Sequence, residues 1–170
     1  MTLIFSYGKK VEPNHDKLNA FTAIAEKYGV KVRNVEYDFE ATADERVPVL
    51  LAAAREEAAK GEELIYAGTS MGCYGSWVAA REVPAKGLFL ISPALFMDGY
   101  AVQDYPLEVA GEVELVIGHE DDVIPRWKVT RFVMDKQLEA HFVKDNHPMP
   151  NSLETLKVLF ETYIQRVAKG

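Results

Sequence analysis

Strand-like runs alternate with amphipathic segments along the whole chain. The strand-like runs are short, apolar and rich in β-branched or aromatic residues, and they cover residues 3–5, 31–37, 64–67, 87–91, 114–117 and 140–143. Between them, apolar residues recur every three or four positions, which predicts helices over 18–28, 44–60, 71–82 and 126–138, and from 151 onward. Six strands separated by helices indicate parallel β-α-β units with right-handed crossovers. The predicted fold is therefore α/β, a three-layer α/β/α sandwich around a six-stranded, mainly parallel sheet.

Residues typical of helix ends support these boundaries. Gly29 and Gly61 directly follow two of the predicted helices, where glycine commonly ends a helix. At the start of the last helix, Asn151 and Glu154 have the spacing of a capping box. Residues 87–91 form the most apolar run, so we expect this strand at the centre of the sheet.

Composition and charge narrow the class of protein. A chain of 170 residues with 48% hydrophobic and 26% charged residues is typical of one globular domain, which we expect to span residues 1–170. The net charge of −7 argues against nucleic acid or an anionic membrane as the main partner. No apolar run approaches the ~20 residues needed to cross a bilayer, so no membrane insertion is expected. The chain begins directly with a strand-like run and without a basic leader, which favours a cytoplasmic protein.

Cys73 is the single cysteine, which excludes an internal disulfide and a thiolate zinc cluster. We interpret it as a small buried hydrophobic residue, and no metal or other cofactor is expected. Oligomeric state is not predicted.

A serine between two glycines follows the third strand-like run. The segment Gly68-Thr69-Ser70-Met71-Gly72 has the form G-x-S-x-G, with a predicted strand before it and a predicted helix after it. A nucleophile elbow needs this order of strand, sharp turn and helix, because the turn exposes the serine hydroxyl at the carboxyl edge of the sheet. The alternative is a loop serine that caps the following helix.

A nucleophilic serine needs a base and an acid that orients the base. His147 follows the last predicted strand, in a loop at the same edge of the sheet as Ser70, while His119 follows the fifth strand and is the alternative base. His15 and His141 are better explained as surface or packing residues. The acidic run in residues 118–125 also follows the fifth strand, and one of its carboxylates could orient the histidine, although such a run can also be a solvated loop.

Taken together, these residues resemble the α/β-hydrolase superfamily, in which the nucleophile, the acid and the histidine follow one another in this order. Residues 118–125 resemble the acid motif G-x-x-D-x-x-V-P with isoleucine in place of valine, which implies Asp121 as the acid and Asp122 as the runner-up. The resemblance implies the strand order 2-1-3-4-5-6 of a minimal, lidless hydrolase of the bacterial type. Only residues 93–110 could form a short lid.

The segment Phe5-Ser6-Tyr7-Gly8-Lys9 is similar to the superfamily's oxyanion loop, with tyrosine where histidine is usual. This similarity implies that the backbone N–H groups of Lys9 and Met71 would bind the oxyanion. Aromatic and apolar side chains near these loops could form the wall of a substrate pocket, with ordinary packing as the alternative: Tyr7, Phe96, Met97, Tyr100 and Trp127.

The resemblance implies a serine hydrolase that cleaves a small-molecule carboxylic ester or thioester through a Ser70-Asp121-His147 triad and an acyl-enzyme. A binding protein that keeps the fold and has lost turnover is the alternative. Dehalogenation is disfavoured, because it normally requires a carboxylate in the position of Ser70.

Overall fold

The computed structural model describes residues 1–9 and 15–169. In this part of the chain, six strands form one parallel sheet in the order β2-β1-β3-β4-β5-β6. The strands are β1 (Thr2–Ser6), β2 (Lys31–Asn34), β3 (Leu64–Thr69), β4 (Ala85–Ile91), β5 (Ala110–Gly118) and β6 (Glu139–Val143). The helices are α1 (Asp16–Lys27), α2 (Ala43–Ala59), α3 (Met71–Ala80), α4 (Arg126–Lys136) and α5 (Leu153–Lys169). The predicted strand order is confirmed, and the sheet is wholly rather than mainly parallel.

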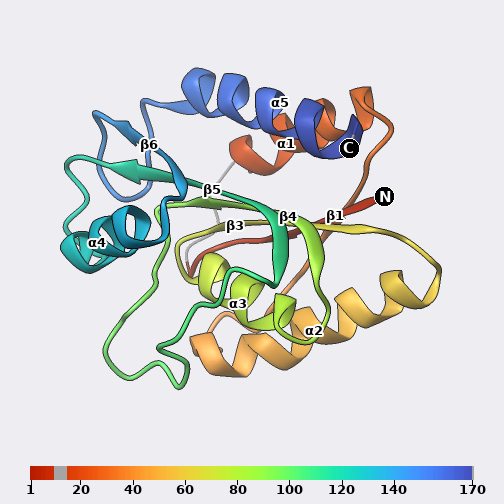
Figure 1. Cartoon of the computed structure of the whole chain (residues 1–170), viewed down its shortest axis with the longest axis horizontal. Coiled ribbons are helices and arrows are strands. Elements are labelled where there is room, and N and C mark those ends of the chain that lie inside the picture. Colours follow the sequence, from red (N-terminus) through yellow and green to blue (C-terminus); the bar gives the residue numbers. More distant parts are fainter. Residues whose placement is uncertain (10–14, 170) are drawn as a thin grey trace.

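The helices cover the two faces of the sheet. Figure 1 shows α1 and α5 along one face and α2 and α3 along the other, with α4 beside them. Under α1 and α5, the rings of Phe21 and Phe160 stack with centroids 4.2 Å apart. On the other face, Trp77 is fully buried, and its indole N–H donates to the carbonyl of Pro106. The predicted three-layer sandwich is therefore present, with a core on each side of the sheet.

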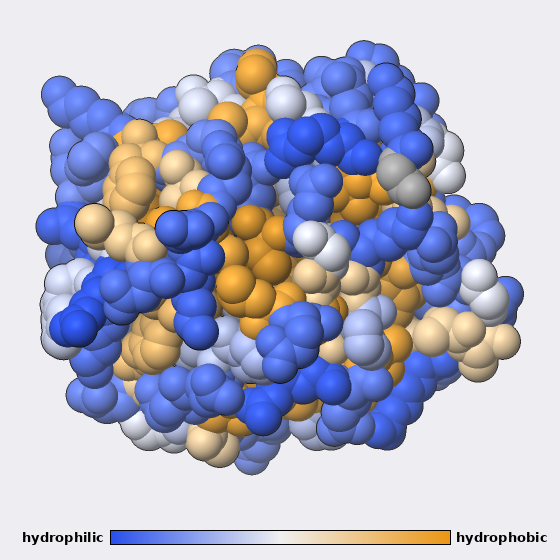
Figure 2. All heavy atoms as spheres, viewed as in Figure 1, coloured by the Kyte–Doolittle hydropathy of each residue, from blue (hydrophilic) through white to orange (hydrophobic). Residues whose placement is uncertain are grey.

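Hydrophilic residues cover much of the outer surface of the molecule. Figure 2 shows this in the orientation of Figure 1, with an apolar area near the centre of the view, where Figure 1 places β4 and β5. Among the described residues, no helix is long and apolar enough to cross a membrane.

Two strand boundaries differ from the periodicity of the sequence. β2 ends at Asn34 rather than near residue 37, because its ladder with β1 ends at the pair of Phe5 and Asn34. The N–H of Val35 still donates to the carbonyl of Phe5, and the chain then leaves the sheet. β5 begins at Ala110, four residues earlier than its apolar run, because it extends along the full length of β4.

The capping box predicted at Asn151 is wrong. α5 begins at Leu153, and Asn151 instead donates both its backbone and its side-chain N–H groups to the buried carboxylate of Asp145. A capping box does form at α2, where Thr42 and Glu45 bond to each other's backbone N–H groups. The buried carboxylate of Asp145 therefore accepts the backbone N–H of Asn151 that Glu154 would have accepted in a capping box.

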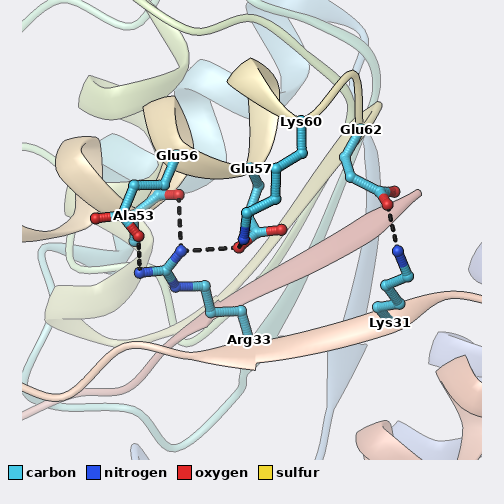
Figure 3. Close-up of polar contacts among 7 residues, drawn as sticks. All are labelled: Lys31, Arg33, Ala53, Glu56, Glu57, Lys60 and Glu62. Carbon is cyan, nitrogen blue, oxygen red and sulfur yellow. Dashed lines mark hydrogen bonds and ion pairs between the residues drawn. The ribbon is translucent and has the colours of Figure 1, made fainter.

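Ion pairs tie the edge strand β2 to α2 and to the turn that follows it. In Figure 3, Arg33 reaches Glu56 and Glu57, at N–O distances of 2.7 and 2.8 Å, while Lys31 pairs with Glu62. Lys60 also reaches Glu57. Glu57 is buried, whereas Arg33, Glu56 and Lys60 are at least partly exposed, so these contacts fasten the edge of the sheet largely at the surface.

Residues 93–109 contain neither a helix nor a strand and cross the molecule beside α2 and α3. The N–H of Ala101 donates to Asp44 of α2 at 3.1 Å, and the N–H of Val102 donates to the hydroxyl of Tyr74 at 3.2 Å. Tyr74 in turn donates to Asp44. The segment is therefore fastened to the body of the protein, and its action as a lid stays a prediction.

Candidate active site

Ser70 lies on a strained turn between β3 and α3. Its φ of 52° and ψ of −118° are unusual for a residue with a side chain, and such a conformation costs about 1–3 kcal/mol. Backbone hydrogen bonds hold it there, since the N–H of Ser70 donates to Ile91 and its carbonyl accepts from Ala94. The hydroxyl of Ser70 does not cap α3, so the alternative reading as a capping serine is wrong.

The two glycines of the motif are required by close backbone approach. A Cβ atom on Gly72 would lie 2.0 Å from the carbonyl oxygen of Ser6, and one on Gly68 would lie 2.7 Å from the carbonyl carbon of Gly72. No side chain fits at either position, so the turn can pass close to β1 only with glycine there. This is the strand–turn–helix geometry that the sequence predicted around Ser70.

Ser70, His147 and Asp121 form one hydrogen-bonded chain. The Nε2 atom of His147 lies 2.8 Å from the Oγ of Ser70, and its Nδ1 lies 2.7 Å from Oδ2 of Asp121. The side chain of Asp121 has no exposed surface, and its Oδ1 accepts from the N–H groups of Val123 and Ile124. The three residues follow β3, β5 and β6, and the parallel sheet brings the ends of these strands together.

The environment of Asp121 favours its charged form. Burial opposes the charge, but the hydrogen bonds from His147 and from the backbone outweigh it and lower the pKa of this carboxyl. Asp121 is therefore ionised at neutral pH and accepts from His147. Asp122, the runner-up, is exposed at the mouth of the cavity.

The loop of His147 is fixed through its backbone by residues that sequence reasoning missed. Ser92 donates its hydroxyl to the carbonyl of His147 at 2.6 Å, and the amine of Lys17 donates to Pro148 at 2.8 Å. Burial lowers the pKa of Lys17, an effect that the charge of Asp145 opposes. The one sequence signal for Ser92 is its place directly after the central strand, at the edge where sites form in parallel sheets.

The other histidines lie in different surroundings. The ring of His119 packs against Phe142 of β6, with 5.7 Å between centroids. The Nε2 of His141 lies 2.7 Å from Glu114, which agrees with the packing role expected for it. His15 is exposed at the rim of the cavity.

The predicted oxyanion donors both lie beside Ser70. A Cβ atom on Gly8 would be 3.0 Å from the Cβ of Ser70, so the backbone preceding Lys9 touches the serine. Met71 is the first residue of α3, and its N–H is one of the N-terminal groups without an intrahelical partner. Both residues line the same cavity as Ser70.

This cavity has a volume of about 740 Å³ and opens to solvent at the carboxyl edge of the sheet. Three of the five predicted pocket residues line it, namely Tyr7, Met97 and Tyr100. The volume lies within the ~300–1,000 Å³ typical of small-molecule sites.

The other two predicted pocket residues, Phe96 and Trp127, do not line this cavity. Phe96 packs edge-on against Tyr105 and Phe132, at 4.9 and 5.4 Å between centroids. Trp127 is 67% exposed, because α4 directs Val129 toward the core and a residue two positions earlier faces outward. Phe96 thus belongs to an aromatic cluster with Tyr105 and Phe132, and the orientation of α4 places Trp127 in solvent.

Cys73 is fully buried, and its thiol donates to the carbonyl of Ile91. Burial raises the pKa of this thiol, so it does not ionise at neutral pH. Within the described ranges, no cluster of histidine, cysteine and acidic side chains could hold a metal ion.

Comparisons with known proteins rest on structure alone, since no protein-family model and no curated protein matches the chain. A protein from Xanthomonas campestris pv. campestris, described as a candidate hydrolase of the alpha/beta superfamily, is similar with a TM-score of 0.85 and 23% identity, over 97% of this chain and 98% of that one. Est1E from Butyrivibrio proteoclasticus is similar with a TM-score of 0.76 and 16% identity, over 99% and 88% of the two chains.

A second Xanthomonas campestris protein, XC6422, is described as an α/β serine hydrolase without a lid. It is similar with a TM-score of 0.78 and 16% identity, over 97% of this chain and 81% of that one. Because these sequence identities are low, the similarities establish a shared fold and not a shared activity. The strand order, the flanking helices and these similarities together show that the chain has the α/β-hydrolase fold.

Proposed function

We propose that this protein is a serine hydrolase that cleaves a carboxylic ester or thioester of a small molecule through an acyl-enzyme. The observation that carries the proposal is the hydrogen-bonded chain from Ser70 through His147 to Asp121, with Ser70 on a strained turn in an open cavity. The similarity of the fold to a protein described as an α/β serine hydrolase without a lid supports it.

In the first step, the Oγ of Ser70 attacks the carbonyl carbon of the substrate. His147 accepts the hydroxyl proton at Nε2, which the distance of 2.8 Å allows without movement of either side chain. Asp121 holds the Nδ1–H of the ring and stabilises the imidazolium that forms. Its lowered pKa keeps this carboxylate charged throughout.

The negative charge that develops on the carbonyl oxygen would be bound by the backbone N–H groups of Lys9 and Met71. The N-terminus of α3 adds a positive dipole end at the same point. Backbone donors fixed in advance act mainly on the transition state, because the oxygen gains its charge only there.

Collapse of the tetrahedral intermediate breaks the bond to the alcohol or thiol, which leaves with the proton from His147. Water then attacks the acyl group on Ser70, with His147 as the base, and the same sequence releases the acid and restores the serine. No cofactor enters either step.

A chain-length series of p-nitrophenyl esters and matching acyl thioesters tests the proposal. The protein should hydrolyse at least part of the series, and Ser70→Ala should lower kcat by a factor on the order of 10⁶. The preferred chain length then reports how much of the apolar cavity wall the acyl group fills. Binding of these compounds without turnover would contradict the proposal and favour an inactive binding protein with the same fold.

A further inference from the structure

Arg46 is a buried cation next to the candidate site. It lies in the first turn of α2 and is 3% exposed. One guanidinium nitrogen, Nη1, donates to the carbonyls of Tyr7 and Gly8 at 3.2 and 3.1 Å, and Nε donates to the carbonyl of Ala41. The guanidinium also lies 4.8 Å from the centre of the Tyr37 ring.

No carboxylate forms an ion pair with Arg46 in the part of the chain that the structure describes. A buried charge is stable only where hydrogen bonds replace water, and here backbone carbonyls and two tyrosine rings do so. Arginine suits this place, because its planar fork presents several donors in fixed directions. The carbonyls of Tyr7 and Gly8 are therefore bound to a fixed donor rather than to water.

The direction of these carbonyls sets the direction of the neighbouring N–H groups. In a trans peptide, the carbonyl of one residue and the N–H of the next lie in one plane and point in opposite directions. Arg46 binds the carbonyl of Gly8, so the N–H of Lys9 points away from Arg46.

The preceding peptide shows the same relation. Arg46 binds the carbonyl of Tyr7, and the N–H of Gly8 points the other way and donates to Thr69 at 3.0 Å. Thr69 adjoins Ser70, so the N–H of Gly8 lies on the side of the serine while the carbonyls of Tyr7 and Gly8 face Arg46. A cation on the carbonyl also polarises the peptide and makes its N–H a stronger donor.

We propose that Arg46 is a positioning residue of the oxyanion site, which aims the N–H of Lys9 at the developing oxyanion and strengthens it as a donor. Tyr37 supports the arrangement, since its N–H donates to the hydroxyl of Tyr7 and its own hydroxyl bonds to Ser6. This inference rests on the proposed hydrolase function and deepens it.

The test compares Arg46→Met and Arg46→Lys with Arg33→Met as the matched control. Arg33 also bonds to α2, through the carbonyl of Ala53 and two glutamates (Figure 3), but it lies on the edge strand β2 and does not line the cavity. With the best ester of the series, Arg46→Met should lower kcat by about 10- to 100-fold, less than the complete loss of one oxyanion donor. KM should change by less than about threefold, because the donor acts on the transition state.

Inhibition by phenylboronic acid, which forms a tetrahedral adduct on a serine, gives a second reading. The affinity of Arg46→Met for phenylboronic acid should fall by about the same factor as its kcat. The affinity of Arg46→Lys should lie between those of Arg46→Met and the wild type. Rates are expressed per site that reacts with a fluorophosphonate, so a partly unfolded preparation does not imitate the effect. Arg33→Met should keep the wild-type kcat and boronate affinity.

Unchanged kcat and boronate affinity per reactive site in both Arg46 variants would overturn the inference and leave the hydrolase proposal standing. An equal fall in Arg33→Met would also overturn it, because the effect would then belong to α2 as a whole. A wild-type protein without turnover would overturn the proposed function, and this inference with it.

Discussion

The loops at the carboxyl edge of the sheet and the β2–α2 edge both depend on charged side chains, but they use them differently. At the carboxyl edge, the charge of Asp121 is buried and each of its oxygens has a defined donor. At the β2–α2 edge, Arg33 and Glu56 are partly exposed and paired at the surface (Figure 3). Exposed ion pairs contribute about 0–1 kcal/mol to the free energy of unfolding, whereas the loss of the partner of a buried charge destabilises the folded state strongly. Burial, rather than the number of ion pairs, therefore decides which contacts fix the geometry.

Backbone strain follows the same division. Ser70, Ser92 and Met149 have positive φ angles and lie in loops at the carboxyl edge. The residues of β2 and α2 show no such angle. The loops that hold the candidate site are therefore strained and tightly bonded, while β2 and α2 have regular backbone and are joined by ion pairs.

The largest expected effect comes from the buried carboxylate. Asp121→Asn should lower kcat by up to about 10⁴-fold, because an amide no longer stabilises the imidazolium or fixes the histidine tautomer. Ester hydrolysis under saturating substrate measures it, with Asp122→Asn as the control, whose kcat should stay within about threefold of wild type. If Asp122→Asn suffers the larger loss, the acid is Asp122.

Next in size is the effect of filling the close approach at Gly72. Gly72→Ala should lower the free energy of unfolding by about 3 kcal/mol or more, because the new Cβ meets the backbone of Ser6. Gly75→Ala lies in the same helix and meets only the tip of Leu50, at 3.4 Å, so it should change stability by about 1 kcal/mol or less. Urea unfolding of both variants checks this, and equal losses would mean that the turn tolerates a side chain.

The acid stability of the protein should depend on Asp121. Its pKa is lowered on folding, so its carboxylate stabilises the folded state above its unfolded pKa of about 4, and this stability is lost as the pH falls through the folded-state value. The free energy of unfolding should therefore fall less in Asp121→Asn than in wild type between about pH 6 and pH 2.5. If the free energy of unfolding of the two proteins falls in parallel over this pH range, the pKa of the Asp121 carboxyl is not lowered on folding.

The smallest effect is expected at the β2–α2 edge. Arg33→Met should lower the free energy of unfolding by about 1 kcal/mol or less, and the difference from wild type should shrink in 1 M salt because exposed charges are screened. Thermal unfolding at low and high salt measures it. A loss as large as that of Gly72→Ala would remove the contrast between the two edges.

The sequence predicted the fold well, because hydrophobic periodicity reports burial directly and β-α-β connections leave little freedom in strand order. Its errors lie where a contact with a distant part of the chain decides the local structure. β2 ends at the last pair of its ladder with β1, and Asn151 bonds to Asp145 instead of capping α5.

Much of the candidate site was also accessible from the sequence. Ser70 stands in a local motif, and His147 and Asp121 follow strands whose ends a parallel sheet brings together. Their catalytic roles stay predictions. Arg46 left no signal and Ser92 only its place directly after the central strand, because both act on backbone carbonyls of distant loops. Side-chain direction in irregular segments is likewise set by packing, which is why Phe96 does not line the cavity.

The central claim is that Ser70 is the nucleophile, and covalent labelling tests it most directly. The protein is treated with a fluorophosphonate probe, and the modified residue is mapped by mass spectrometry of its peptides. Ser76→Ala is the matched control, because this buried serine lies in α3, the helix that follows Ser70, and its hydroxyl has no hydrogen-bond partner among the described residues. We predict that wild type and Ser76→Ala carry the label on Ser70 and that Ser70→Ala carries none. Labelling that persists in Ser70→Ala, or a wild-type protein that does not react, would contradict the claim.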